Sequence, residues 1–151
     1  MVDILHRVGI KAPLNEVYKA LATRDGVAAW WTNSTQGDSQ VGGTLRFLFS
    51  SGGADIGNIA VKVLELQPAE RVLWQVVDGP AEWIGTQLSF ELKQDGEYVI
   101  VLFKHQGWHE PVEFMHHCST KWAIFLMSLK SLVETGTGAP NPNDVKIDNW
   151  N

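Results

Sequence analysis

The chain has 151 residues, of which 44% are hydrophobic and 19% are charged. This length corresponds to one ordinary domain that buries roughly 70% of its unfolded surface, so the core needs no disulfide or metal to support it. The net charge is −5, and the lysines and arginines are scattered along the chain. A nucleic acid or an anionic membrane would require clustered positive charge, so we expect neither as a partner.

Cysteine content and the apolar stretches indicate the compartment in which the chain works. Cys118 is the only cysteine, so no internal disulfide can form, which suits a reducing cytoplasm. The first residues lack the basic and apolar regions of a signal peptide, and no apolar stretch approaches the ~20 residues of a membrane span. We therefore expect a cytoplasmic protein without a membrane span.

The first part of the chain predicts one strand and two short helices. Apolar residues alternate along 4–10, which is typical of a strand. A proline then opens a helix over 14–22, in which the apolar residues share one face. Asp25 is expected to cap a second short helix that carries Trp30 and Trp31.

Five further strands are expected in the middle of the chain. Alternating or β-branched apolar runs, separated by turn residues, predict them at 45–49, 56–66, 71–77, 86–93 and 99–105. The tightest connection is a hairpin turn with Asp95 and Gly96 at its centre. Short turns between consecutive strands imply an antiparallel meander, which makes about six strands in all.

A long helix is predicted after Gly107, where the hydrophobic period changes from two residues to three or four. The apolar positions are Met115, Cys118, Trp122, Phe125, Leu129 and Leu132. They describe a helix of about 24 residues, or ~36 Å, that Gly136 ends. The element order predicts an α+β helix-grip fold, in which a curved antiparallel sheet wraps around the long C-terminal helix.

We expect a single domain over residues 1–136 and an extended tail over 137–151. Two prolines in the tail favour an extended backbone, so the helix cannot continue. The tail also carries Val145, Ile147 and Trp150, although disordered segments are depleted in such residues. We therefore predict that the tail runs back along the domain and places Ile147 and Trp150 on an apolar groove. The alternative is a frayed terminus.

Motifs that resemble one known superfamily occur in order along residues 4–136. They are the stretch Ile10 to Leu21, Trp30-Trp31, Val41-Gly42-Gly43, Gly57, Pro68 to Trp74, Phe103 to Trp108, and Trp122 to Gly136. Together they resemble the START-like, or SRPBCC, superfamily, and within it the branch named after the C-terminal domain of the heat-shock-protein-90 ATPase activator. The resemblance implies a helix-grip fold. The superfamily includes binders of lipids, hormones and polyketides and a few cyclases and hydroxylating enzymes, so the fold alone does not define the function.

The chain departs from this branch in two respects. Lys121 stands before the helix tryptophan, where the family often has glycine. True activators also carry a separate N-terminal domain that contacts the chaperone, and the sequence shows no such domain. We therefore do not expect the resemblance to carry co-chaperone activity over to this chain.

A metal site is suggested by His105, His109, His116, His117 and Cys118, which lie close together in the sequence. The ligands of a metal must converge on one ion. His116 and His117 are adjacent on a helix and point about 100° apart, so both cannot face the same ion. His109 and His117 lie in different segments and could meet. Because the spacing is poor, we expect neither a metal nor a cofactor.

The sequence offers few groups for catalysis. Cys118 lies on the apolar stripe of the long helix, where a small buried hydrophobe is expected. A nucleophilic cysteine would need a base and an electropositive setting, and His105 is the only candidate partner. The chain shows no obvious pair of inward-facing carboxylates, no phosphate-binding loop and no serine nucleophile elbow. We therefore assign no catalytic residue.

The strongest functional signal is the aromatic content, which includes seven tryptophans. Aromatic rings at inward positions either fill the core or line a cavity between the sheet and the long helix. The candidate ligand-binding residues are Trp30, Trp31, Phe47, Phe49, Trp74, Phe90, Phe103, His105, Trp108, Cys118, Trp122 and Phe125. The imidazole of His105, predicted on the same strand face as Phe103, and the tryptophan N–H groups are the polar groups expected to orient a ligand.

We favour a binding protein for a small apolar ligand, lipid-like or aromatic, that lies in such a cavity without being chemically changed. One alternative is an enzyme of the cyclase or hydrolase type that uses His105 as acid or base. Another is a protein-interaction or chaperone-modulating module, which requires a large exposed apolar patch. Ile100 and Leu102, on the opposite strand face from Phe103, could belong to such a patch or serve a homodimer.

Overall fold

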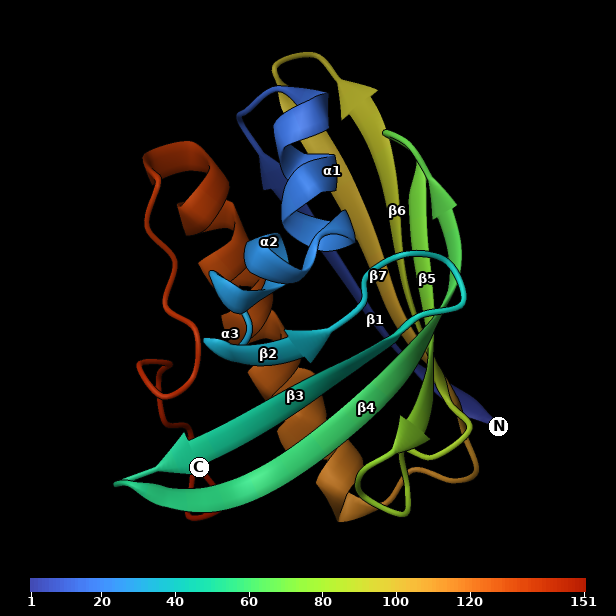
Figure 1. Cartoon of the computed structure of the whole chain (residues 1–151), viewed down its shortest axis with the longest axis vertical. Coiled ribbons are helices and arrows are strands. Elements are labelled where there is room, and N and C mark those ends of the chain that lie inside the picture. The colour runs from blue at the N-terminus through green and yellow to red at the C-terminus, as the bar shows by residue number, and fades with distance from the viewer.

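The protein folds as a seven-stranded antiparallel sheet that curves around a long C-terminal helix, as Figure 1 shows for the computed structural model of residues 1–151. The elements are β1 (Val2–Ile10), α1 (Leu14–Ala22), α2 (Arg24–Ala28), β2 (Ser34–Gly37), β3 (Thr44–Ser51), β4 (Ala54–Gln67), β5 (Arg71–Asp78), β6 (Gln87–Asp95), β7 (Tyr98–Trp108) and α3 (Glu113–Thr135). The strand order across the sheet is β1-β7-β6-β5-β4-β3-β2, and every neighbouring pair is antiparallel. The predicted α+β helix-grip fold is confirmed.

The sheet has one strand more than the sequence predicted. β2 is only four residues long and polar, so no hydrophobic alternation marks it. It forms because Thr35 and its neighbours pair with the segment around Phe47, at the edge of β3 where backbone groups still need partners. The remaining strands lie where they were predicted. Most extend further at one or both ends because pairing with a neighbour continues beyond the apolar run, whereas β6 begins one residue later than predicted.

The cap of α2 also differs from the prediction. Thr23 rather than Asp25 caps the helix, since its side-chain oxygen accepts a hydrogen bond from the Gly26 N–H at 3.1 Å. Thr23 has the extended backbone of a cap, whereas Asp25 is already in the first turn, where its charge favours the helix dipole. Trp30 and Trp31 follow the helix instead of belonging to it, and both side chains are buried.

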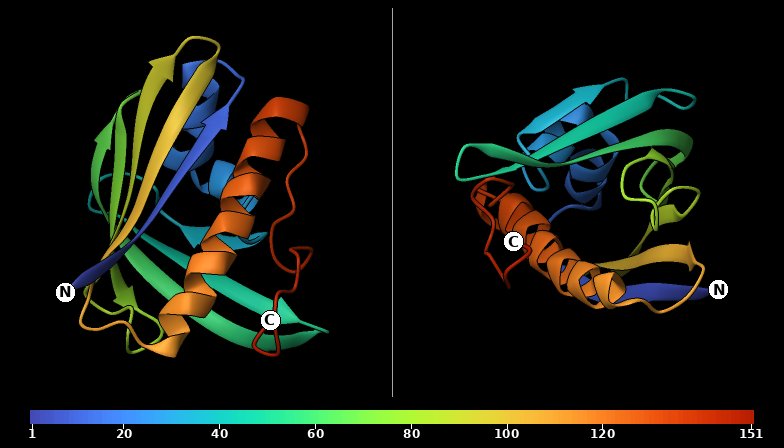
Figure 2. Two further views of the ribbon diagram at one scale, coloured as in Figure 1. Left: turned by 180° about the vertical axis from the view of Figure 1, so that it is seen from behind. Right: turned by 90° about the horizontal axis from the view of Figure 1, so that it is seen from below.

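α3 lies across the concave side of the sheet (Figure 2). It ends where Gly136 adopts a left-handed backbone, with φ of 90°, and donates its N–H to Leu132 O at 2.8 Å. Trp122, Phe125 and Leu129 are 2%, 5% and 0% exposed, as their helical spacing predicted. They belong to one core of 29 buried residues that joins α3 to the sheet. None of the helices has the length and hydrophobicity needed to cross a bilayer.

The tail, residues 137–151, runs back beside α3 (Figures 1 and 2). Its most buried side chains are polar, with Asn141 1% and Asp144 5% exposed, whereas Trp150 is 48% exposed. The Asn141 side chain accepts from the Ser50 N–H at 2.8 Å and donates to Ser50 O at 3.0 Å. Hydrogen bonding therefore holds the tail more firmly than the apolar contacts that the sequence suggested, because a buried amide retains its place only with both groups satisfied.

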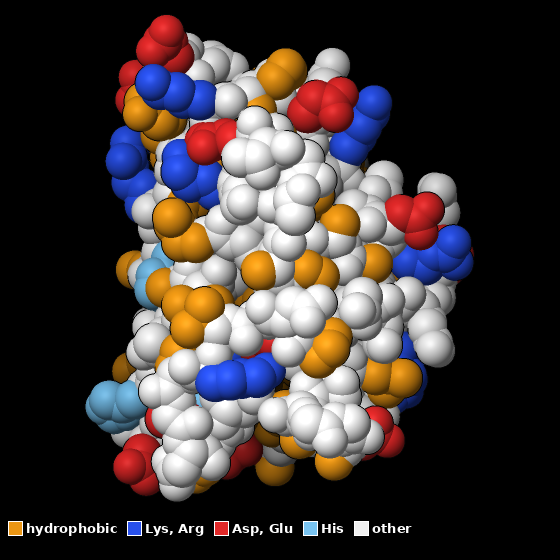
Figure 3. All heavy atoms as spheres, turned by 90° about the vertical axis from the view of Figure 1, so that its left-hand side faces the viewer, with side chains coloured by type: hydrophobic (Ala, Val, Ile, Leu, Met, Phe, Trp, Pro, Cys, Tyr) orange, Lys and Arg blue, Asp and Glu red, His pale blue; other side chains and the backbone are white.

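Ile100 and Leu102, which the sequence placed on the outer face of β7, differ in their exposure. Ile100 is only 4% exposed, because its side chain lies over Gly9 and next to Tyr98. Leu102 is partly buried. On the side of the molecule that α3 and the tail occupy, apolar side chains are scattered among charged ones (Figure 3).

Candidate ligand-binding site

A pocket of about 170 Å³ opens between the β3–β4 hairpin, the β5–β6 loop, the first half of α3 and the tail. It is lined by Trp31, Phe49, Ile56, Gly57, Asn58, Ile59, Pro80, Trp83, Phe114, His117, Cys118, Lys121, Trp122, Phe125, Trp150 and Asn151. Ten of these sixteen residues are hydrophobic. A mostly apolar hollow with a few polar groups is typical of small-molecule sites.

Two local features create the hollow. On α3, Phe114, Cys118 and Trp122 recur every four residues, so they line up on the face that meets the pocket. On the sheet, Gly57 pairs with Phe49 across β3 and β4, and such cross-strand partners share a face. Because Gly57 has no side chain, the space beside Phe49 stays open, and even an added Cβ would lie 3.8 Å from Phe49.

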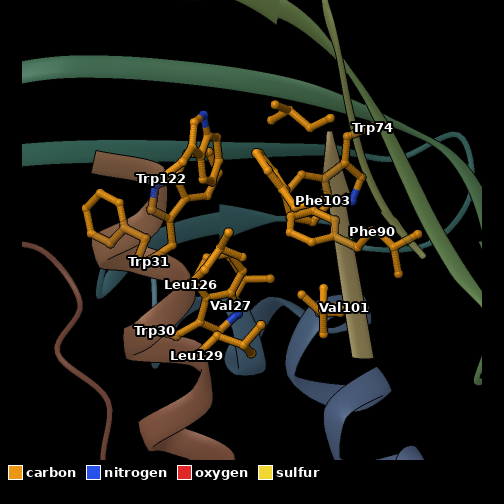
Figure 4. Packing of buried hydrophobic residues seen from close by; sticks show 14 of the residues in the cluster. Val27, Trp30, Trp31, Trp74, Phe90, Val101, Phe103, Trp122, Leu126 and Leu129 are labelled. Atoms are coloured by element: carbon orange, nitrogen blue, oxygen red, sulfur yellow. The ribbon is translucent and has the colours of Figure 1, made fainter. Parts of the chain in front are cut away.

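The structure divides the predicted ligand-binding residues into two groups. Those that line the pocket are Trp31, Phe49, Cys118, Trp122 and Phe125, whereas Trp30, Phe47, Trp74, Phe90, Phe103, His105 and Trp108 do not. The second group packs ring on ring deeper in the core, with the centroid of Phe90 5.3 Å from Trp74 and 5.2 Å from Phe103. Figure 4 shows these three rings grouped together, with Trp122 projecting from α3 and Trp31 close to that helix. The aromatic residues deep in the core therefore pack against one another, whereas those nearer the surface border a hollow.

Three aromatic lining residues were absent from the predicted set: Trp83, Phe114 and Trp150. Phe114 lies four residues before Cys118, so the helical spacing could have identified it. Trp83 lies in the loop between β5 and β6, where periodicity gives no signal. It is 6% exposed and stacks on Trp122, with centroids 5.9 Å apart and an interplanar angle of 20°. One sequence feature could have identified Trp83: it is a large ring in a loop rich in turn residues, and such a ring requires an apolar partner.

His105 is completely buried behind the pocket and holds two of the pocket tryptophans. Trp122 Nε1 donates to His105 Nδ1 at 3.2 Å. Because Nδ1 accepts this bond, the proton of the neutral ring lies on Nε2, which donates to Thr86 Oγ1 at 2.8 Å. Thr86 Oγ1 donates in turn to Trp83 O at 2.5 Å. His105 therefore points inward, as the strand alternation predicted, and orients Trp122 and the loop that carries Trp83.

Burial determines the ionisation of both titratable candidates from the sequence. Burial disfavours the imidazolium of His105 and lowers its pKa from 6.5 to about 3. A proton on Nδ1 would also face the N–H of Trp122 and remove that hydrogen bond. Cys118 lines the pocket, but burial raises the pKa of its thiol to about 12, so the thiolate that a nucleophile requires is not formed near neutral pH.

A buried ion pair attaches the tail at the edge of the pocket. Lys121 Nζ donates to Asp144 Oδ2, and to Val145 O at 2.9 Å. Asp144 also accepts from Lys146 Nζ at 3.3 Å. Burial alone would raise the pKa of Asp144, but the hydrogen bond and charge of Lys121 and the hydrogen bond of Lys146 hold that pKa below its usual range. Lys121 is therefore one of the α3 residues that hold the tail against the helix, and the one that pairs with its buried carboxylate.

The end of the tail closes one side of the pocket. His117 Nδ1 lies 2.7 Å from Asp148 Oδ2, and the hydrogen bond from His117 lowers the pKa of Asp148. Next to this contact, the Trp150 ring has its centroid 5.6 Å from that of His117 and 6.3 Å from that of Phe114. Trp150 and Asn151 thereby line the pocket, although about half of the Trp150 side chain is exposed.

The histidines that suggested a metal site are separated in the structure. His105 lies in the core, His117 is bonded to Asp148, and His116 Nδ1 lies 3.3 Å from Val112 O. No three histidine, cysteine, aspartate or glutamate side chains come together in an arrangement that could hold a metal ion.

Comparisons with known proteins connect this geometry to a family. A family model described as "Activator of Hsp90 ATPase homolog 1-like protein" matches residues 11–134. Among solved structures, the Aha1 dimer from Colwellia psychrerythraea is similar over 91% of this chain and 100% of that chain, with 43% sequence identity and a TM-score of 0.78. No curated protein matches the sequence.

Two further solved structures, each 20% identical in sequence, share the fold alone. DynU16, from the dynemicin biosynthetic locus, has a TM-score of 0.75 and aligns with 90% of this chain and 48% of that chain. CalU16 from Micromonospora echinospora has a TM-score of 0.70 and aligns with 93% of this chain and 77% of that chain. The family match extends over most of the domain, and the chain belongs to the Activator of Hsp90 ATPase homolog 1-like family.

Proposed function

We propose that the protein binds a small, neutral, apolar molecule, about the size of one aromatic ring, in the pocket beside α3. The observation that carries this proposal is the pocket volume of about 170 Å³ between mostly apolar walls. An engineered apolar cavity of ~150 Å³ in another protein stays dry and binds benzene. A molecule with several fused rings would exceed this volume while the tail stays in place.

The polar groups around the pocket favour a neutral ligand. The ammonium group of Lys121 already donates to Asp144 and Val145, and His117 is bonded to Asp148. An anionic ligand would have to compete with the carboxylate that Lys121 holds. A charged ligand without a partner would be strongly disfavoured in a mostly apolar site.

We propose binding without catalysis because His105 and Cys118, the acid–base and nucleophile candidates from the sequence, are both unsuited to chemistry. General acid–base catalysis needs a group that faces the substrate and has a pKa near the working pH. His105 has both ring nitrogens bonded within the core and a pKa of about 3, and the Cys118 thiol has a pKa of about 12. In this proposal His105 influences the ligand only through Trp122 and Trp83, which it positions.

A side chain added at Gly57 tests the proposed site. The Cβ of residue 57 would make ordinary contact with Phe49 at 3.8 Å, so Gly57→Leu is expected to fill the pocket without straining β4. Lys62→Leu is the matched control, because it adds the same side chain at an exposed position of the same strand.

Toluene and benzoate are suitable probes, since they have nearly the same size and differ in charge. We expect wild-type protein and Lys62→Leu to bind toluene, as measured by shifts of the tryptophan indole N–H signals in NMR spectra. Gly57→Leu is expected to bind it at least about tenfold more weakly, or ~1.4 kcal/mol. Unchanged toluene binding by Gly57→Leu, or a preference for benzoate, would refute the proposal. Native mass spectrometry of protein from its own source would give the mass of the resident ligand.

A second candidate function is modulation of a heat-shock-protein-90 ATPase by a homodimer of this chain. It is favoured by 43% identity with the full length of a protein described as an Aha1 dimer. Light scattering measures the dimer, and an ATPase assay of the chaperone with and without this protein tests the modulation. A monomer that leaves the ATPase rate unchanged would remove this candidate. Because Gly57→Leu alters the pocket, its effect in the same assay separates a ligand-dependent role from a ligand-independent one.

A further inference from the structure

The tail consists of two parts that differ in burial. The first part, which we call the anchor (residues 141–144), contains Asn141 and Asp144, which are 1% and 5% exposed and hydrogen-bonded to the domain. The second part, which we call the flap (residues 145–151), is far more exposed, with Val145 60% and Trp150 48% exposed. Segments with few buried apolar contacts open at a low free energy, so the flap can leave the domain while the anchor stays.

The flap is also a compact unit. Its backbone turns on itself, with Ile147 N–H donating to Asn151 O at 3.0 Å and Asn151 N–H donating to Asp148 O at 3.2 Å. The Trp150 N–H donates to Asp148 Oδ1 at 2.8 Å. Asp148 therefore organises the flap internally and, through its other oxygen, joins it to His117 on α3. Lys121 on α3 also donates to Val145 O at 2.9 Å and to Asn151 O at 3.5 Å, so an opening of the flap breaks these bonds together with the one between His117 and Asp148.

The wall of the pocket that Trp31 and α3 form is part of the packed core. Trp31 and Trp122 are each 2% exposed and Phe125 is 5% exposed, because all three belong to the packed core. Trp150 and Asn151 are the two lining residues that come from the flap. Ile56 is also exposed, but its hairpin is held by the pairing of β3 with β4, whereas the flap belongs to no strand. The flap is therefore the wall that can move most readily.

We infer that the flap is a removable wall of the ligand pocket and that Trp150 is a specificity-determining residue, which restricts the closed site to a molecule of about one ring. This inference rests on the proposed function, because it assigns the entry side and the size limit of the same site. The ligand enters when the flap leaves α3 and is covered when Asp148 returns to His117 and Trp150 to Phe114. Removing the Trp150 ring extends the pocket toward solvent and admits longer apolar molecules.

Opening of the flap can be measured without any ligand. Cys118 is the only cysteine, lines the pocket and is 4% exposed, so its reaction with N-ethylmaleimide reports access to the pocket. We expect Trp150→Ala to react on the order of tenfold faster than the wild type, which corresponds to ~1.4 kcal/mol. Asp148→Asn is expected to react faster by a smaller factor, since it keeps the ring. Val145→Ala, at an exposed position of the flap, is the control and is expected to react at the wild-type rate.

Two further measurements make the outcomes distinguishable. Urea unfolding of each variant shows whether faster labelling follows from global unfolding, in which case the flap proposal is overturned. Naphthalene and toluene test the size limit, and Trp150→Ala is expected to raise the ratio of naphthalene affinity to toluene affinity. Unchanged labelling in Trp150→Ala and Asp148→Asn would overturn the flap, and an unchanged affinity ratio would overturn the role of Trp150. Faster labelling in a protein that binds neither probe would support the flap and overturn the proposed function instead.

Discussion

The inner core and the pocket contain the same kinds of side chain, yet one is filled and the other is hollow. In the inner core, the Phe90 ring has aromatic partners on both sides, with Trp74 and Phe103 at 5.3 and 5.2 Å between centroids. In the pocket, Phe49 stands opposite Gly57, and the outer wall is formed by the half-exposed Trp150. Aromatic content therefore does not determine whether a region becomes packed core or cavity. The residue opposite each ring determines it.

Truncating one ring in each region should give the largest contrast. Phe90→Ala is expected to lower the free energy of unfolding by about 3–5 kcal/mol, because it leaves a closed cavity among rings that cannot collapse. Phe125→Ala, at the pocket, is expected to lower it by roughly half as much, since one side of that ring already faces open space. Urea unfolding of both variants measures the difference. Equal losses would mean that the pocket is packed like the inner core.

His105, which lies between the two regions, is expected to make the free energy of unfolding depend on pH in acid. The unfolded chain binds a proton at this residue below about pH 6.5 and the folded protein only near pH 3, so the unfolded state holds more protons between these values. The stabilisation from the neutral, buried ring is therefore complete above pH 6.5 and decreases as the pH falls. At about pH 4.5 the decrease is about 2–3 kcal/mol.

The variant His105→Gln isolates this contribution. Urea unfolding near neutral pH and at about pH 4.5 should show a smaller acid-induced loss in the variant than in the wild type, by the same 2–3 kcal/mol. Other groups titrate in both proteins and cancel in the comparison. The same acid-induced loss in both proteins would show that His105 takes up its proton without leaving the core.

The attachment of the tail should depend on Lys121 far more than on Lys146. Lys121→Met leaves the buried carboxylate of Asp144 with one exposed ammonium partner, so we expect a loss of about 1–3 kcal/mol and release of the tail. Lys146→Met keeps the buried pair and is expected to change stability by less than about 1 kcal/mol. Hydrogen exchange of the amides from Asn141 to Trp150 measures the release. Similar exchange in both variants would contradict a special role for Lys121.

The smallest effect is expected at Gly57 itself. Gly57→Ala adds a methyl group at ordinary contact distance from Phe49 and should change the free energy of unfolding by less than about 0.5–1 kcal/mol. Chemical denaturation measures this value. A large destabilisation would mean that the space beside Phe49 is required for folding, and Gly57→Leu would then no longer test ligand binding.

Local patterns in the sequence predicted most of the fold. The period-two alternation located the main strands, and the spacing of Trp122, Phe125 and Leu129 located the buried face of α3. These predictions succeeded because the side-chain direction in a strand or helix repeats over a few residues. β2 and the cap of α2 were missed or misplaced, because a four-residue polar strand has no apolar pattern and Thr23 competes with Asp25 for the cap.

The sequence by itself determined which rings turn inward, but only the tertiary structure decided which of them border a hollow. That outcome depends on contacts between distant segments: Gly57 beside Phe49, the loop residue Trp83 against Trp122, and Trp150 returning to α3. Periodicity describes one element at a time, whereas a cavity is the space left between several elements. Its position follows from the register of β3 and β4 and from the path of the tail, and neither is encoded in a local pattern.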